Sequence, residues 1–319
     1  MLMKQTTQNS QLVDAHGRWI HKLRVQLIDA CNYRCVYCMP EYVIFRPSSE
    51  LLSSKEIIDI CDTLIGLGID EIRLTGGEPT LRRDLIQIAR GVSGLPVKKL
   101  GLTTNGLKLK EKLSALKSTR CQHINISLDS LNPQKYERIT RRNNLDEVLS
   151  SIFIAKDMGF SVKINVVVMR GFNHDEILDY IAFSAKHNIE VRFLELMKIG
   201  CAVRNFDETF VSAQEMIDQI NEPLEKQKMK RDSTSFNFKT LSGAHIGFIA
   251  SESRPFCGGC SRLRLTADGK LRACLMSEKG ADLRGKDKKE YRSIVESVMK
   301  MKPTGRIDKI SQPMYQIGG

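Results

Sequence analysis

Short runs of β-branched and apolar residues alternate with longer amphipathic patterns from residue 22 onward. Six runs have the pattern of strands, and they cover residues 22–27, 71–77, 99–106, 123–130, 162–169 and 191–197. Helical patterns lie between them, such as residues 53–68, with serines and Glu56 at the start and Gly68 at the end. Residues 145–159 form another, which ends at Gly159. The chain therefore has a predicted (βα)6 repeat.

Strands that alternate with helices pair in parallel through right-handed crossovers. Six such units predict an α/β fold, an incomplete (βα)6 TIM-like barrel, with a doubly wound open sheet as the alternative. In both folds, reactive groups belong in the loops after the carboxyl ends of the strands. The regular alternation of strand and helix patterns ends after about residue 200. We therefore predict a partial barrel over residues 1–200 and a C-terminal domain over residues 201–319. The last residues, 308–319, hold too few apolar side chains to predict an element.

Composition and charge narrow the class of protein only partly. The net charge of +12 suits an anionic partner, such as nucleic acid, a membrane surface or a phosphorylated small molecule. The densest basic run, residues 283–292, is interrupted by acids and is typical of a solvated helix face. The polar N-terminal segment lacks the pattern of a signal peptide, and no apolar run reaches membrane-spanning length. We therefore expect a cytoplasmic protein with no membrane or nucleic-acid partner.

Six of the nine cysteines fall into two tight triplets, which is typical of metal binding. Isolated positions are held by Cys61, Cys121 and Cys201, and Cys61 lies on the apolar side of a helical pattern. The first triplet directly follows the first predicted strand and consists of Cys31, Cys35 and Cys38. Three thiolates leave one iron of a cubane cluster open to a further ligand. A zinc knuckle that takes a ligand from elsewhere is the alternative.

The second triplet has the spacing C-x2-C-x13-C and consists of Cys257, Cys260 and Cys274. A zinc site that adds His245 is one interpretation. Arg262 and Arg264 stand two residues apart in a predicted strand, so both guanidinium groups point to one face. Paired guanidinium groups suit a phosphate or carboxylate, although surface arginines remain the alternative.

A Gly-Gly-Glu-Pro stretch follows the second predicted strand. Adjacent glycines allow the backbone to approach a ligand closely, and Glu78 could accept a hydrogen bond from an ammonium group. Together with the first triplet and the aromatic Tyr37 before its last cysteine, this stretch resembles the radical S-adenosylmethionine (SAM) superfamily. The resemblance implies a [4Fe-4S] cluster whose open iron binds SAM, and one-electron cleavage of SAM to methionine and a 5′-deoxyadenosyl radical.

A narrower resemblance rests on the C-terminal half of the chain. The second triplet with its Arg-Leu-Arg, the Glu-Leu-Met at residues 195–197 and the terminal diglycine resemble the GTP 3′,8-cyclase family of molybdenum cofactor biosynthesis. This resemblance covers nearly the whole chain. It implies a lyase that converts GTP to (8S)-3′,8-cyclo-7,8-dihydroguanosine 5′-triphosphate. It also implies two [4Fe-4S] clusters that face one cavity, the second of which binds the guanine of GTP.

The same resemblance implies a set of site residues. The SAM contacts would be Tyr37, Gly77, Ser127 and Met197. The GTP contacts would be Arg24, Arg73, Thr104, Lys163, Arg262 and Arg264. Catalytic roles would fall to Arg262, Arg264, Gly318 and Gly319. Taken singly, Met197 also fits a core position, Ser127 a helix cap, Lys163 a surface charge and the diglycine a frayed end.

Partners follow from the resemblance as well. It implies an electron donor such as flavodoxin or ferredoxin, a downstream cyclic pyranopterin monophosphate synthase, and allows a homodimer. Two positions depart from the family pattern, Ser261 after Cys260 and Lys198 after Met197. One alternative is therefore another radical SAM enzyme with an auxiliary cluster, acting on a peptide or a related nucleotide. A more distant one is a zinc-binding module that recognises RNA.

Overall fold

The structure is a computed structural model that describes residues 11–318. Within this range, twelve strands form one sheet in the order β12-β11-β10-β1-β2-β3-β4-β5-β6-β9-β8-β7. The barrel strands are β1 (Lys22–Gln26), β2 (Glu71–Thr75), β3 (Lys99–Thr104), β4 (Cys121–Ser127), β5 (Ser161–Val168) and β6 (Glu190–Glu195). The remaining strands are β7 (Leu224–Lys226), β8 (Phe236–Thr240), β9 (His245–Ile249), β10 (Arg262–Leu265), β11 (Lys270–Arg272) and β12 (Gly280–Asp282).

All six predicted strands are present, and they pair in parallel in sequence order. A doubly wound sheet would reverse its strand order at a switch point. No reversal occurs between β1 and β6, so the prediction of an incomplete barrel is confirmed.

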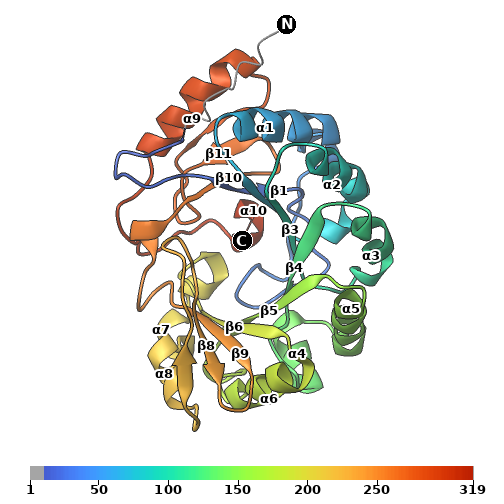
Figure 1. The fold of residues 1–319 in the computed structure, drawn as a ribbon, viewed down its shortest axis with the longest axis vertical. Helices are drawn as coiled ribbons and strands as arrows, with labels where there is room; N and C mark the ends of the chain where they lie inside the picture. The colour runs from blue at the N-terminus through green and yellow to red at the C-terminus, as the bar shows by residue number, and fades with distance from the viewer. Residues whose placement is uncertain (1–10, 319) are drawn as a thin grey trace, which may run out of the picture.

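Helices cover the outer side of the curved sheet, as Figure 1 shows for α1, α2, α3 and α5. The helices are α1 (Ser54–Gly66), α2 (Leu85–Ser93), α3 (Lys110–Lys117), α4 (Pro133–Thr140), α5 (Leu145–Asp157), α6 (Ile177–His187), α7 (Phe206–Thr209), α8 (Ala213–Asp218), α9 (Tyr291–Lys300) and α10 (Met314–Ile317). The predicted start of α1 is confirmed, because Ser53 and Glu56 form a capping box there. None of the helices described in residues 11–318 is both long and apolar enough to cross a membrane.

Residues 201–318 extend the same sheet at both edges. Strand β9 pairs in parallel with β6, and β10 pairs in parallel with β1. The outer strands β7, β8, β11 and β12 then continue these edges in antiparallel pairs. The predicted boundary between two domains near residue 200 therefore stays a prediction. The sheet is continuous and contains strands from both sides of that boundary.

Alternation along the barrel strands separates an apolar outer side from a polar inner side. Leu23 and Val25 of β1 are buried in the main hydrophobic core with residues of α1 and α2. The alternating residues, Lys22 and Arg24, are only partly buried and line internal cavities. This alternation recurs in β2 and β6, so the inside of the barrel is polar and cationic.

The C-terminal tail differs from the sequence prediction, which expected no element there. Residues Met314–Ile317 form the short helix α10, whose Tyr315 and Ile317 are buried. Figure 1 shows α10 in the middle of the barrel. The tail is fixed by tertiary contacts that local composition does not reveal, including a hydrogen bond from Gln26 Nε2 to the carbonyl of Tyr315 at 2.7 Å.

Candidate functional site: two cysteine triplets around one cavity

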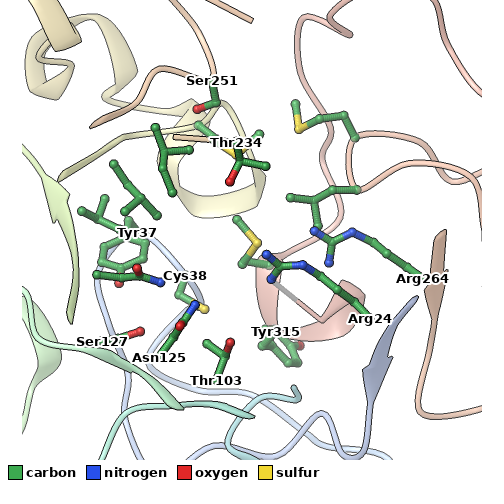
Figure 2. Close-up of a pocket in the computed structure, with 18 of the residues that line it drawn as sticks. Arg24, Tyr37, Cys38, Thr103, Asn125, Ser127, Thr234, Ser251, Arg264 and Tyr315 are labelled. Atoms are coloured by element: carbon green, nitrogen blue, oxygen red, sulfur yellow. The ribbon is translucent and has the colours of Figure 1, made fainter. Parts of the chain in front are cut away.

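A cavity of about 330 Å³ lies at the carboxyl ends of the barrel strands. It is lined by all six cysteines of the two triplets, although the triplets are far apart in the sequence. Figure 2 shows Cys38 and Tyr37 on one side of this cavity, and Arg24 and Arg264 on another. The barrel therefore brings both candidate metal centres to one space, which is where a barrel fold places its active site.

The first triplet lies in the loop that follows β1. Sγ of Cys31 accepts hydrogen bonds from the backbone of Tyr33 at 3.4 Å and from Asn105 Nδ2 at 3.8 Å. The loop turns tightly at Cys38, whose amide donates to the carbonyl of Cys35 at 2.9 Å. Burial raises the pKa of Cys31 to about 12 and that of Cys35 well above its ordinary value. These thiols therefore need a bound metal to become thiolates.

The second triplet has cations next to its sulfur atoms. Cys260 Sγ accepts from Lys302 Nζ at 3.4 Å and from an Arg262 guanidinium nitrogen at 3.7 Å. Burial alone raises the pKa of Cys260, but the charges of Arg262 and Lys302 outweigh it and bring the pKa to about 6. A thiolate at Cys260 is therefore stable near neutral pH even without a metal.

The spacing of the sulfur atoms tests the zinc alternative. Within residues 11–318, the only groups of three or more His, Cys, Asp or Glu side chains with ligand atoms all within 4.8 Å involve His21, Asp70 and Glu71. A single tetrahedral zinc with Zn–S bonds of about 2.3 Å holds its sulfurs roughly 3.8 Å apart. Neither triplet is that compact, so both fit a larger iron-sulfur cluster better than one zinc ion.

The proposed extra zinc ligand, His245, lies away from the second triplet. It is an exposed residue at the start of β9, with backbone hydrogen bonds to the hydroxyl of Ser184. It does not line the cavity that holds the cysteines. The Cys3His arrangement therefore has no support in the structure.

The predicted SAM contacts lie together with the first triplet. Tyr37, Gly77, Ser127 and Met197 all line the cavity, and the Tyr37 hydroxyl donates to Asp129 at 2.7 Å. A Cβ on Gly77 would lie 2.2 Å from the carbonyl oxygen of Asp29, so only glycine fits this position. Met197 also packs against a small apolar cluster that contains Ile199. It therefore contributes to the core and lines the cavity as well.

Glu78, which the sequence predicts to accept a hydrogen bond from a ligand's ammonium group, lines the cavity and also accepts several bonds within the chain. Its carboxylate is 1% exposed and accepts hydrogen bonds from the amide and hydroxyl of Thr80, the hydroxyl of Thr104 and the amide of Asn105, at 2.6–2.9 Å. These bonds join the loop after β2 to the end of β3. Glu78 thus orients the loop, and the hydroxyl of Thr104, a predicted GTP contact, already donates to it.

The predicted GTP-binding cations converge inside the barrel. We call the cavity lined by the cysteines the upper cavity, and Arg264 lines it. Arg73 and Lys163 line a second cavity of about 380 Å³, which we call the lower cavity. Arg24 and Arg262 line both cavities. Burial and then the charges of Arg264 and Arg262 lower the pKa of Arg24. Within residues 11–318, none of the four arginines forms an ion pair with a carboxylate. Arginines that repel one another and have no ion-paired carboxylate make a strong anion site.

Three further residues at the cavities were missed by the sequence prediction. Arg192 of β6 lines both cavities, and its guanidinium is 2.8 Å from Glu190, which also pairs with Lys163 at 2.5 Å. Thr103 lines the upper cavity with a buried hydroxyl that has no hydrogen-bond partner in the described chain. Asn165 has an unpartnered carbonyl oxygen in the same cavity. Since buried polar groups are almost always bonded, these atoms indicate a ligand.

Gly318, the first residue of the terminal diglycine, contacts Arg264 on the cationic side of the cavity. A guanidinium nitrogen of Arg264 donates to the carbonyl of Gly318, whose backbone has a φ of 68°. A Cβ at Gly318 would lie 2.9 Å from that of Gln26. The interpretation of this end as frayed therefore fails for Gly318, while Gly319 lies outside the described residues.

The two departures from the family pattern have structural roles away from the sulfur atoms. The hydroxyl of Ser261 donates to Asp232 at 3.0 Å, and its carbonyl accepts from the amides of His21 and Lys22. Lys198 places its ammonium 4.7 Å from the ring centre of Phe206. Neither residue lines the upper or the lower cavity.

Two family models match this chain. The Radical SAM superfamily model matches residues 25–184, and the Molybdenum Cofactor Synthesis C model matches residues 189–306. The first match includes the first triplet and the barrel helices, and the second includes the second triplet. Together they account for most of the described chain.

Curated relatives match over most of their length. The chain is 46% identical over 310 residues to a GTP 3′,8-cyclase of Synechocystis sp., covering 97% of this chain and 95% of the relative. It is 43% identical over 290 residues to a GTP 3′,8-cyclase of Aquifex aeolicus, covering 88% and 89%. It is 38% identical over 336 residues to a mitochondrial GTP 3′,8-cyclase of Arabidopsis thaliana, covering 99% and 86%.

Solved structures share the fold at low sequence identity. Streptococcus suis SuiB bound to S-adenosylmethionine has a TM-score of 0.63 at 14% identity, covering 89% of this chain and 69% of that chain. SuiB bound to the precursor peptide SuiA has a TM-score of 0.61 at 13% identity, covering 89% and 68%. At this identity the likeness shows a common architecture and does not indicate the substrate.

Proposed function

Because this chain belongs to the GTP 3′,8-cyclase family within the radical SAM superfamily, we propose that it converts GTP to (8S)-3′,8-cyclo-7,8-dihydroguanosine 5′-triphosphate. This is the first step of molybdenum cofactor biosynthesis. The observation that carries the proposal is the single cavity lined by two cysteine triplets and by arginines, of which Arg24 and Arg264 form no ion pair with a carboxylate in the described chain. No feature of that cavity favours a peptide substrate or RNA recognition.

The first triplet would hold a [4Fe-4S] cluster through Cys31, Cys35 and Cys38. When bound, that cluster supplies the electron that cleaves SAM to methionine and the 5′-deoxyadenosyl radical, which removes the C3′ hydrogen of GTP. The chain's own task here is positioning. The hydrogen bonds of Glu78 fix the loop that carries Gly77, and the bond to Asp129 fixes the ring of Tyr37 at the cavity wall.

GTP would be held by the cations inside the barrel. Arg73, Lys163 and Arg192 line the lower cavity, where the triphosphate would neutralise their charges. Arg24 and Arg262 line both cavities and would span the phosphates and the nucleoside. Arg264 and Gly318 would close the nucleoside end. This arrangement holds C3′ still and excludes water from the reacting atoms.

The second triplet would hold a second [4Fe-4S] cluster through Cys257, Cys260 and Cys274, with an open iron for the guanine. Its support is the set of cations around Cys260, together with three sulfur atoms that are not all within 4.8 Å of one another. We further propose a flavodoxin-like or ferredoxin-like electron donor, a cyclic pyranopterin monophosphate synthase that consumes the product, a cytoplasmic location and a homodimer.

Product identification tests the proposal. Protein reconstituted under anaerobic conditions is incubated with SAM, dithionite and GTP deuterated at C3′. We expect a GTP-dependent cyclised product and deuterium in the 5′-deoxyadenosine, both measured by mass spectrometry. Formation of unlabelled 5′-deoxyadenosine at a rate that ignores GTP would refute the activity. Iron analysis tests the second cluster, with about eight irons per chain expected and about four contradicting it.

A further inference from the structure

Lys302 is a buried ammonium group beside the second cysteine triplet. The residue is 4% exposed and lies just beyond the end of α9. Its Nζ donates to the carbonyl of Arg262 at 2.7 Å, the carbonyl of Ala273 at 3.0 Å and Sγ of Cys260 at 3.4 Å. These three acceptors match the three protons of an ammonium group.

The three bonds connect the two segments that carry Cys260 and Cys274. Arg262 opens β10 two residues after Cys260, and Ala273 directly precedes Cys274 after β11. Lys302 therefore holds both cysteine segments in one relative position. A side chain that only filled space there would have no reason to be charged.

The positive charge of Lys302 has no carboxylate partner within residues 11–318. The charged or ionisable groups that act on it are the thiols of Cys260 and Cys274 and the guanidinium of Arg262. Burying an ammonium group is unfavourable unless an opposite charge lies close by. Thiolates that bind a metal cluster would supply that charge.

The first triplet has no ammonium or guanidinium group hydrogen-bonded to its sulfur atoms in the described chain. Sγ of Cys31 contacts a backbone amide and the neutral side-chain amides of Asn32 and Asn105, and the guanidinium of Arg34 acts on this sulfur only through its charge. Hydrogen bonds to ligand sulfurs and nearby charge are among the features that set the potential of an iron-sulfur cluster. The two sites therefore differ in a feature that controls reduction.

We propose that Lys302 is a positioning residue of the second cluster, which fixes the Cys260 and Cys274 segments and makes that cluster easier to reduce. The inference rests on the proposed second cluster. A positive charge at a ligand sulfur stabilises the reduced, more negative form of the cluster. Removing the charge while keeping a polar side chain should then lower the reduction potential without removing iron.

The test uses the full chain with Cys31, Cys35 and Cys38 replaced by Ala, so that only the second cluster remains. Lys302→Gln and Lys302→Arg are compared in this background by iron and sulfide analysis and by redox titration followed by electron paramagnetic resonance. Lys300→Gln is the matched control, because Lys300 is exposed at the end of α9.

We expect Lys302→Gln to keep its iron and to become about tenfold harder to reduce, which is a shift of about 59 mV to more negative potential for one electron. Lys302→Arg keeps the positive charge, so its reduction potential should equal that of the parent. The control Lys300→Gln should also have the parent's reduction potential. If Lys302→Gln has the parent's potential, or if Lys302→Arg shifts as far as Lys302→Gln, the proposal is wrong.

The remaining outcomes are also decisive. If Lys302→Gln loses iron and Lys302→Arg keeps it, the second cluster needs the positive charge of Lys302, which supports the proposal. If both variants lose iron, Lys302 acts only through packing, and the proposal is wrong. Absence of iron in the background protein with Lys302 intact would instead refute the second cluster itself. Failure of the inference and failure of the proposed function are therefore distinguishable.

Discussion

The two cysteine triplets line one cavity in opposite electrostatic surroundings. Around the first triplet, burial and then the nearby charge of Glu78 raise the pKa of Cys31 to about 12. Around the second, Arg262 and Lys302 overcome burial and lower the pKa of Cys260 to about 6. The surroundings of Cys31 thus disfavour a negative charge and those of Cys260 favour one, whereas burial raises the pKa of Cys257 in the second triplet as well.

This difference supports the proposal that the two ends of the cavity hold different ligands. In the described chain the first end has no cation hydrogen-bonded to its sulfur atoms, which suits SAM with its positive sulfonium group. The second end shares its arginines between thiolates and the space where GTP would bind. We therefore expect substitutions at the two ends to separate SAM cleavage from GTP chemistry.

The largest expected effect comes from removing one cysteine at each end. Cys35→Ala should abolish 5′-deoxyadenosine formation, because the first cluster cannot assemble. Cys260→Ala should abolish the cyclised product while SAM cleavage continues. Both products are measured by liquid chromatography, with iron content as the check on assembly. If Cys260→Ala also stopped SAM cleavage with the first cluster intact, the two ends would not be separable.

Arg24→Met tests the cationic end without touching a cysteine. A buried charge-assisted hydrogen bond contributes about 1.5–3 kcal/mol, so GTP affinity should fall roughly 10- to 100-fold in isothermal titration calorimetry. SAM affinity and iron content should not change. Without GTP, the variant should melt at the parent's temperature or above it, because burial and neighbouring arginines disfavour the charge of Arg24.

Arg90→Met is the matched control for this substitution. Arg90 is exposed in the last turn of α2, outside both cavities. It should leave GTP affinity unchanged. An equal loss of affinity in Arg90→Met would mean that net charge, rather than the barrel interior, attracts the nucleotide.

Gly318→Ala should have a smaller effect, confined to the GTP end. The left-handed backbone at φ 68° and the contact with Gln26 make a Cβ unfavourable by about 1–2 kcal/mol. We expect product formation to fall roughly 5- to 30-fold, with SAM cleavage preserved. Gly66→Ala in α1, where a Cβ meets nothing within 4 Å, is the control. Full product formation by Gly318→Ala would contradict a role for the tail.

Much of the barrel could be predicted because each strand carries its own signal. Apolar residues at every second position, as in Leu23 and Val25, specify an outer face that must be covered by helices. The short strands β7, β11 and β12 have three residues each, too few for a period to show. Helix α10 depends on contacts with Gln26 and Arg264, which no local pattern reveals.

Only those residues of the candidate site that belong to recognisable sequence motifs were predicted. Cysteine spacing and the resemblance pointed to the triplets and to six substrate contacts. Arg192 had a usable signal that was missed, because Glu190, Arg192 and Leu194 alternate with the buried residues of β6. Lys302 had no such signal. It follows a helix and reaches Cys260 only through the tertiary fold.

The smallest expected effect concerns Glu190, whose carboxylate pairs with two cations that line the lower cavity. It pairs with Lys163 and Arg192, whose charges hold the pKa of Glu190 below its usual range despite burial, so it is ionised at neutral pH. A triphosphate would compete with this carboxylate for the same two cations. Glu190→Gln should therefore raise GTP affinity about two- to fivefold, in line with about 0.5–1 kcal/mol for a partly exposed pair.

Guanosine is the matched ligand for this experiment, because it lacks the phosphates. Its affinity for Glu190→Gln should equal that for the parent in the same calorimetric titration, and SAM binding at the first triplet should also be unchanged. Weaker GTP binding by Glu190→Gln would show instead that Glu190 orients Lys163 and Arg192. In that case its two ion pairs organise the anion site and do not compete with the substrate.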